Sequence, residues 1–142
     1  MSAQGKEKLR IIFLCSYNSV RSQIAEGLMR HLFGTRYDVF SAGIARSGVN
    51  PYAVAVMKEI GIDISGQRSK SLLEFKGRHF DVVVTLCDNG KDACLSCLPD
   101  GGRVIHYHVP PPHEIGLSNE DVMREFREVR EQIKNWLIYQ FG

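Results

Sequence analysis

The sequence predicts an α/β domain with three α/β/α layers and a four-stranded parallel sheet. Two observations support this prediction. The runs Leu9–Leu14 and Phe80–Leu86 are apolar almost throughout, as is typical of strands buried on both faces of a sheet. Segments with apolar residues at helical spacing alternate with the strand-like runs, which favours parallel strands joined by helices. We therefore expect right-handed crossovers and a ligand site beyond the carboxyl ends of the strands.

The first helix and second strand have clear local signals. Apolar residues recur at helical spacing at Ile24, Leu28 and Leu32, and Gly34 is a typical helix end. Tyr37–Ser41 then predicts a short strand that ends at Gly43.

A second helix is predicted to begin after Asn50-Pro51 and to end at Gly61, because proline is favoured in the first helical turn. Ser69–Phe75 is a candidate short helix. Phe80–Leu86 and Arg103–Tyr107 follow as the third and fourth strands.

The end of the chain combines an extended segment with a long helix. Pro110–Pro112 is stiff and extended. Ser118, with Asp121 three residues later, is a typical helix start. The apolar face of this helix is predicted to consist of Val122, Phe126, Val129, Ile133 and Trp136.

Length and composition indicate one soluble domain. The 142 residues are enough for a single core, and 44% apolar and 24% charged residues are ordinary values. We expect residues 1–8 to be a flexible N-terminus and residues 9–142 to form the domain. No apolar run is long enough to span a membrane or to act as a signal peptide. We therefore expect a cytoplasmic monomer with neither a nucleic-acid nor a membrane partner.

The most informative segment lies between the first strand and the first helix, and reads Cys15-Ser-Tyr-Asn-Ser-Val-Arg21-Ser22. Backbone N–H groups at a helix N-terminus converge on one point and bind anions. A thiol placed there is predicted to be a thiolate at neutral pH and a nucleophile. Arg21 offers two parallel hydrogen bonds to an oxyanion, and Ser22 is placed to donate to the sulfur. The predicted oxyanion-binding residues are Ser16, Tyr17, Asn18, Ser19, Val20 and Arg21.

The other three cysteines are close together in the sequence. Cys87 follows the third strand, and Cys94 and Cys97 lie in a segment rich in glycine, asparagine and aspartate. In a cytoplasmic chain such cysteines are more often reactive or metal-binding than structural. A zinc site with His106 or His108 is an alternative, but a single C-x-x-C pair is weak evidence for it. We expect no metal and no cofactor.

The cysteine loop, continued as Phe13-Leu-Cys-Ser-Tyr-Asn-Ser-Val-Arg-Ser-Gln-Ile-Ala-Glu26, resembles the low-molecular-weight protein tyrosine phosphatase superfamily. Within it, the chain is most similar to the thioredoxin-coupled arsenate reductases. The likeness extends over nearly the whole chain after the first eight residues. It continues through Phe40–Gly43, Val49–Pro51, Met57–Ser65 and Asp81–Cys87.

The resemblance implies arsenate reduction by a relay of three thiols. Cys15 attacks arsenate, Cys87 attacks the cysteine–arsenic adduct, and Cys94 forms the final disulfide that thioredoxin reduces. Cys97 is an alternative resolving thiol. Each step is thiol–disulfide exchange, which requires an accessible, deprotonated attacker.

Two other functions remain open. A phosphatase of the same fold would hydrolyse phosphate monoesters through a cysteinyl-phosphate and would need Cys15 and Arg21 but not Cys87. An oxyanion-binding or redox-sensing module without turnover would keep only the anion-binding loop at Cys15, residues 15–22, which we call the cradle.

The chain departs from the family in the loop after the fourth strand. The resemblance implies an Asp-Pro pair whose aspartate is the general acid, yet proline occupies that position, at Pro111. A general acid typically contributes about 10²–10⁴-fold in rate. Glu114, His108 and His113 are the candidate substitutes; for the histidines, an ordinary role as loop residues is an equal alternative.

A second departure concerns potassium, which some of these reductases bind. Asn18, Glu26 and Ser41 match that site, but Arg68 and Lys70 replace a threonine and an acid. Because a lysine ammonium can supply the positive charge, we expect no required potassium ion.

Overall fold

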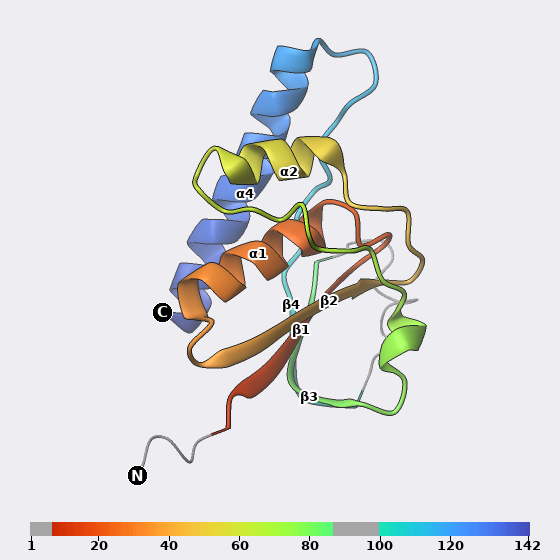
Figure 1. The fold of residues 1–142 in the computed structure, drawn as a ribbon, viewed down its shortest axis with the longest axis vertical. Coiled ribbons are helices and arrows are strands. Elements are labelled where there is room, and N and C mark those ends of the chain that lie inside the picture. The colour runs from red at the N-terminus through yellow and green to blue at the C-terminus, as the bar shows by residue number, and fades with distance from the viewer. Residues whose placement is uncertain (1–6, 87–99) are drawn as a thin grey trace.

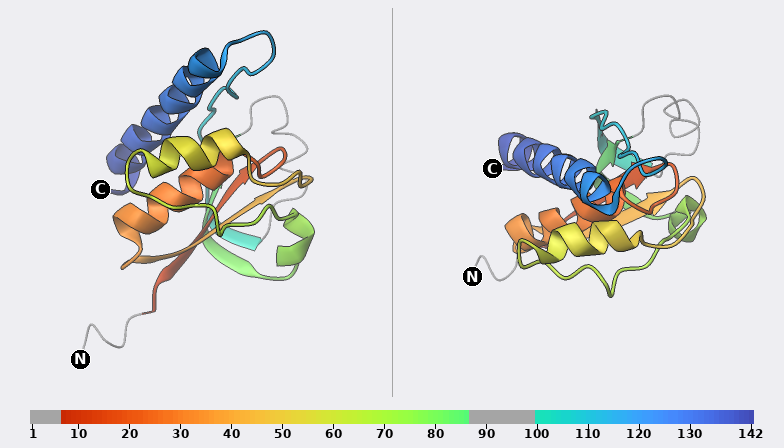
Figure 2. Two further views of the ribbon diagram at one scale, coloured as in Figure 1. Left: turned by 45° about the horizontal axis from the view of Figure 1, so that its top comes forward. Right: turned by 90° about the horizontal axis from the view of Figure 1, so that it is seen from above.

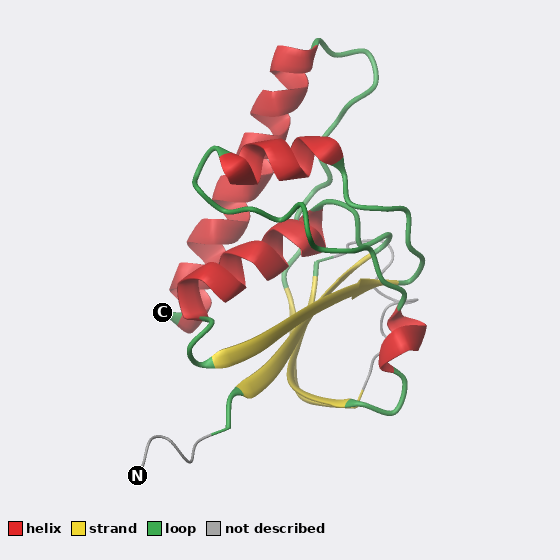
Figure 3. Cartoon of the chain, viewed as in Figure 1, coloured by secondary structure: helices red, strands yellow, loops and turns green. Residues whose placement is uncertain are grey.

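A computed structural model describes residues 7–86 and 100–142. The described residues form one parallel sheet with the strand order β2-β1-β3-β4 (Figures 1 and 3). The strands are β1 (Leu9–Cys15), β2 (Tyr37–Gly43), β3 (His79–Thr85) and β4 (Asp100–His106). The predicted α/β class and four-stranded parallel sheet are therefore confirmed.

Strand β1 is central, and its register places the nucleophile loop. Cys15 is aligned with Gly43 of β2, and Leu14 is aligned with Thr85 of β3. Ile11, Ile12 and Phe13 are fully buried, as expected for a strand covered on both faces. The carboxyl ends of β1, β2 and β3 therefore meet at one edge of the sheet.

Within the described residues, three α-helices pack together on one face of the sheet, and Figure 2 shows them from two sides. They are α1 (Arg21–Phe33), α2 (Pro51–Lys58) and α4 (Asn119–Phe141). Their buried side chains join Ile11 and Phe13 of β1 in a single hydrophobic cluster. This cluster holds α1 against β1 and so fixes where the cysteine loop enters the helix.

On the opposite face of the sheet, the described part of the chain has a short 3-10 helix, η2 (Leu72–Phe75). Phe75 packs edge-on against Phe40 and Phe80, with ring centroids 5.8 and 5.7 Å away. Only the second half of the predicted Ser69–Phe75 helix is helical, since Ser71 is extended and its hydroxyl caps Leu73.

Three of the predicted helix boundaries are confirmed, whereas α2 ends at Lys58 and a turn fills the three residues up to the predicted end at Gly61. Gly34 follows α1, Asn50 caps α2 through the backbone N–H of Tyr52, and Ser118 caps α4 through that of Asp121. The predicted apolar face of α4 is confirmed, because its first four residues are buried and Trp136 is partly buried against the same cluster. Its buried stripe continues through Leu137, and Trp136 is half-buried and stacks on Tyr107 at 4.3 Å.

Three predicted site residues, Cys87, Cys94 and Cys97, lie outside the described residues. The same holds for residues 1–6 of the predicted N-terminal segment. Within the described ranges, no helix is long and apolar enough to cross a membrane.

Candidate active site

Cys15 lies at the carboxyl ends of the strands, where the ligand site was predicted. It is the last residue of β1 and is only 3% exposed. The backbone N–H of Leu86, the residue before Cys87, donates to the carbonyl of Leu14 at 2.8 Å. The main chain leading to Cys87 therefore passes directly beside the main chain leading to Cys15.

Ser22 is positioned to donate a hydrogen bond to the Cys15 sulfur. The Sγ and Oγ atoms are 2.9 Å apart, and both residues are buried. The side-chain amide of Asn18 donates to the same Ser22 Oγ at 2.7 Å. Because that contact uses an acceptor site of the hydroxyl, the hydroxyl hydrogen is left for the sulfur. A donated hydrogen bond stabilises a thiolate more than a thiol.

Asn18 is the central residue of the cradle. It has a φ of 52°, a left-handed conformation that asparagine tolerates better than most residues. Its Nδ2 also donates to Ser41 Oγ at 2.9 Å, and its Oδ1 accepts from Gln23 Nε2 at 2.9 Å and from the Lys70 backbone at 2.7 Å. These contacts fix the orientation of the amide and therefore the position of Ser22.

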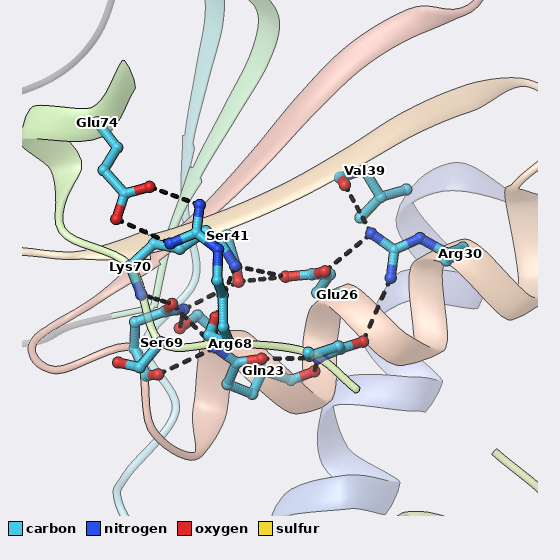
Figure 4. A network of polar contacts seen from close by, with 12 residues as sticks. Gln23, Glu26, Arg30, Val39, Ser41, Arg68, Ser69, Lys70 and Glu74 are labelled. Atoms are coloured by element: carbon cyan, nitrogen blue, oxygen red, sulfur yellow. Dashed lines mark hydrogen bonds and ion pairs between the residues drawn. The ribbon is translucent and has the colours of Figure 1, made fainter. Parts of the chain in front are cut away.

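Asn18 is connected through Ser41 to a charge network centred on the buried Glu26. Figure 4 shows this network. Ser41 donates to the Glu26 carboxylate. Lys70 Nζ lies 3.4 Å from the same carboxylate oxygen and donates to the Arg68 carbonyl at 2.8 Å. Arg30 pairs with the other oxygen of Glu26 at 2.8 Å. Burial lowers the pKa of Lys70, while the neighbouring Glu26 carboxylate opposes that shift.

The ammonium of Lys70 therefore lies beside Glu26, in the network where the resemblance placed a potassium ion. The geometry agrees with the idea that lysine supplies the positive charge there. The requirement for potassium itself stays a prediction.

Gly43 allows β2 to approach the cradle closely. A Cβ atom at this position would lie 2.7 Å from the Asn18 nitrogen and 2.8 Å from the Tyr17 carbonyl carbon. Both are backbone atoms, which cannot move aside as a flexible side chain would. The glycine is thus required by the packing of the strand end against the loop.

Arg21 begins α1 and lies at the cavity with Cys15. Its Nη1 donates to the carbonyl of Val109 at 2.9 Å and lies 3.4 Å from that of Leu86. The guanidinium therefore links the nucleophile loop to the chain after β3 and to the chain after β4. The first turn of α1 has no acidic residue, so the positive end of the helix dipole is not neutralised there.

A cavity of about 210 Å³ opens at Cys15. Of the predicted cradle residues, Tyr17, Ser19, Val20 and Arg21 line it. Ser16 and Asn18 are not among the lining residues. Ser16 accepts a backbone hydrogen bond from Ala45 at 3.1 Å, and Asn18 acts through Ser22.

The opposite wall of the cavity comes from the loop after β4. Pro111, Pro112 and Glu114 line it, and Asn50 Nδ2 donates to Glu114 Oε2 at 3.3 Å. Glu114 is thus the candidate proton donor that the structure brings to Cys15.

The two candidate histidines do not line this cavity. His113 pairs with Glu125 at 2.9 Å, and the hydrogen bond from the His113 side chain lowers the pKa of that carboxyl. His108 is exposed.

Sequence reasoning missed two kinds of site residue. Ser47 and Asn50 line the cavity from the segment before α2, and Gln23 supports Asn18 from α1. The sequence Asn50-Pro51 predicted a helix cap, but it gave no sign that the Asn50 side chain also contacts Glu114. In the part of the chain that the structure describes, no group of histidine, cysteine and acidic side chains is arranged to hold a metal ion.

A thiol at the carboxyl end of a parallel strand, facing a cavity together with an arginine that begins the next helix, is typical of thiol proteins that bind oxyanions. The family model for low molecular weight phosphotyrosine protein phosphatases matches residues 10–139, and the chain belongs to this family.

Within this family, the curated relatives with similar sequences include several arsenate reductases. An arsenate reductase of Halalkalibacterium halodurans is 43% identical over 123 residues, 87% of this chain and 88% of its own length. One from Bacillus subtilis is 41% identical over 89% of this chain and 91% of its own length.

Solved structures with a similar fold include both arsenate reductases and low molecular weight phosphatases. An arsenate reductase in the phosphate-binding state has a TM-score of 0.74 and 31% identity, covering 92% of this chain and 95% of that one. A low molecular weight protein tyrosine phosphatase from T. tengcongensis has a TM-score of 0.69 and 27% identity, with 93% and 99% covered.

Proposed function

We propose that the protein reduces arsenate to arsenite with a relay of three thiols that thioredoxin recharges. The observation that carries the proposal is the Cys15 sulfur, held by Ser22 at 2.9 Å in a cavity that Arg21 lines. The likeness to arsenate reductases at about 40% identity favours arsenate over phosphate esters. We also infer a cytoplasmic monomer.

The first chemical step joins sulfur to arsenic. The Cys15 thiolate attacks arsenate, a sulfur–arsenic bond forms, and one arsenate oxygen leaves as water after protonation. Arg21 holds two of the remaining oxygens, and the N–H groups of the loop bind the negative charge.

The second step is the reduction. The Cys87 thiolate attacks the Cys15 sulfur, and a disulfide forms as the sulfur–arsenic bond breaks. The electron pair of that bond passes to arsenic, which leaves as arsenite. Cys94, or Cys97 in its place, then displaces Cys15 and forms a disulfide with Cys87, which thioredoxin reduces.

Substitution Cys87→Ser tests this relay. We expect thioredoxin-driven arsenite release to fall to background, because the adduct on Cys15 has no resolving thiol. Mass mapping after one turnover without reductant should show a bridge from Cys87 to Cys94 or Cys97 in the parent protein. Full activity of Cys87→Ser, or fully reduced thiols after turnover, would exclude the relay.

Glu114 is our proposed proton donor for the departing oxygen. Its carboxylate is part of the cavity wall and is steadied by Asn50, whereas the position where the resemblance implies an acid is Pro111. We expect Glu114→Gln to slow formation of the Cys15–arsenic adduct about tenfold to a hundredfold, the lower part of the usual range for a general acid.

The matched control is His113→Gln, the neighbouring residue, which pairs with Glu125 away from the cavity. It should leave the rate of adduct formation within twofold. If Glu114→Gln and the parent protein form the adduct at equal rates at every pH, Glu114 is not the proton donor, and water delivers the proton instead.

Phosphate ester hydrolysis is the second candidate, because Cys15, Ser22 and Arg21 equally suit attack on phosphorus. It predicts hydrolysis of p-nitrophenyl phosphate that requires Cys15 and Arg21 and is unchanged by Cys87→Ser. Binding of oxyanions without turnover of either substrate would instead favour a binding or sensing module.

A further inference from the structure

A second cavity, of about 480 Å³, lies behind the cradle and shares no lining residue with the cavity at Cys15. It lies beside the network of Figure 4, between α1, β2 and the segment around η2. Four of its lining side chains are cationic, and we refer to it as the basic cleft. These four are Arg30, Arg68, Lys70 and Arg78.

The carboxylates at the basic cleft neutralise only part of this charge. Glu26 is shared between Arg30 at 2.8 Å and Lys70 at 3.4 Å. Glu74 makes a two-pronged pair with Arg68, at 2.6 and 3.0 Å. Four cations thus face two carboxylates, which leaves two positive charges in excess.

Arg78 is the member of this set with no carboxylate partner among the described residues. Its guanidinium lies over two aromatic rings, 5.3 Å from the centroid of Phe40 and 5.2 Å from that of Phe75. Such stacking occupies the face of the guanidinium and leaves its N–H edge available. The aromatic support therefore orients Arg78 without using its hydrogen-bond donors.

We propose that the basic cleft binds a tetrahedral dianion of the sulfate or phosphate type. Two surplus charges match a dianion, and the planar fork of arginine matches two of its oxygens. The buried ammonium of Lys70, whose desolvation disfavours its charged form, gains from a nearby anion.

This site is linked to the cradle by a short path. The Lys70 backbone donates to Asn18 Oδ1 at 2.7 Å, and Gln23 spans the Arg68 carbonyl and Asn18. An anion in the basic cleft therefore stabilises the segment that orients Asn18. The proposal does not depend on which reaction Cys15 performs.

Sulfate titration of the full chain, followed through backbone amide resonances, tests the proposal site by site. Ser19 and Val20 report on the cavity at Cys15, and Gly66 and Lys70 report on the basic cleft. We expect two separate binding curves. Arg78→Ala should weaken the cleft curve at least tenfold and leave the other within twofold.

Lys76→Ala is the matched control, because it removes one exposed positive charge close to Arg78 but outside the cleft lining. Arg78→Lys keeps the charge and loses the fork, so we expect an intermediate affinity. The amide spectrum also shows whether each variant is folded.

Three results would overturn the proposal. They are a single binding curve for all four amides, a cleft curve unchanged in Arg78→Ala, and equal shifts with chloride at the same ionic strength. Phenylphosphonate, a stable mimic of a phosphate monoester, decides the source of the dianion. Binding tighter than sulfate indicates a phosphorylated molecule, and equal or weaker binding indicates the free ion.

Discussion

The two walls of the cavity at Cys15 are held in opposite ways. The cradle wall, residues 15–22, is backed by side chains that are almost completely buried and hydrogen-bonded to one another, with Asn18, Ser22 and Ser41 fully buried. The loop wall, residues 110–114, is largely exposed. Its Glu114 accepts a hydrogen bond from Asn50, whose backbone N–H donates to the carbonyl of Ser19 in the cradle wall.

In the proposed mechanism, this difference separates oxyanion binding by the cradle wall from proton delivery by the loop wall. A buried, fully satisfied polar network tolerates little change, because removing one partner leaves others unpaired at a cost of about 1–3 kcal/mol each. An exposed loop tolerates substitution at little cost in stability. An aspartate can therefore give way to Pro111 on the loop wall while the cradle keeps its geometry.

The largest effect should come from Gly43→Ala, which breaks the cradle wall without touching a reacting group. The new Cβ would press on the backbone of Asn18 and Tyr17, and overpacking of this kind costs about 1–3 kcal/mol. A displacement of about 1 Å at the reacting atoms lowers the rate about a hundredfold. Single-turnover assays and thermal melts measure both effects.

Gly66→Ala is the control for Gly43→Ala, since a Cβ there meets no atom within 4 Å. It should change the rate less than twofold. A similar loss in both variants would mean that the cradle is sensitive to any glycine change.

Pro111→Asp tests the loop wall by adding a carboxylic acid that can donate a proton, whereas Gly43→Ala tests the cradle wall by damaging it. Pro111 lines the cavity and is exposed, so an acid there reaches solvent and substrate without burial. We expect hydrolysis of p-nitrophenyl phosphate to rise at least about tenfold, within the range of a general acid. Stability should change little. An unchanged hydrolysis rate would show that Glu114 already supplies the proton.

Lys70→Ala examines the charge behind the cradle. Glu26 keeps Arg30 but loses its second cation, so we expect a loss of about 2–3 kcal/mol, below the usual cost of breaking a buried pair. In the parent protein, exchanging potassium for sodium should change neither activity nor melting temperature. Partial rescue of the variant by potassium would support the role given to the ammonium, whereas potassium dependence of the parent would contradict it.

The smallest effect should come from Glu59→Gln, outside both walls, where Glu59 joins α2 to Arg127 and Arg130 of α4. The hydrogen bond from Arg127 lowers the pKa of Glu59 below 4.5. A lowered pKa stabilises the fold above about pH 4.5, and this contribution is lost as the pH falls through the folded-state value. We expect a melting temperature about 2–4 °C lower at pH 7 and no difference in strong acid.

Glu128→Gln on the exposed side of α4 is the control for this change. It should melt within about 1 °C of the parent at both pH values, as is usual for surface substitutions. If it loses as much as Glu59→Gln, the effect is one of net charge rather than of the pair.

The fold was predictable because its signals are local. Apolar runs, caps at Asn50 and Ser118, and Gly34 after α1 each lie within a few residues of the element they define. The ring partner of Trp136 could not be predicted in this way, because the indole stacks on Tyr107, 29 positions earlier in the chain.

The candidate site was predictable only in part. The cradle is contiguous in sequence, so its cysteine, arginine and serine could be identified together. Contacts such as Asn50 to Glu114 join residues 64 apart, and no local pattern encodes such a meeting. Among three candidate proton donors, only the folded chain could place Glu114 at the cavity and His113 away from it.

The stack between Tyr107 and Trp136 has a practical consequence. The chain contains one tryptophan, and its indole lies parallel to Tyr107, just after β4 and two residues before Val109. Val109 is also the residue whose carbonyl accepts from Arg21. Fluorescence excited at the long-wavelength edge, where tryptophan absorbs and the five tyrosines do not, therefore arises from a single indole close to the start of the loop wall. It offers an optical signal for following that loop in real time.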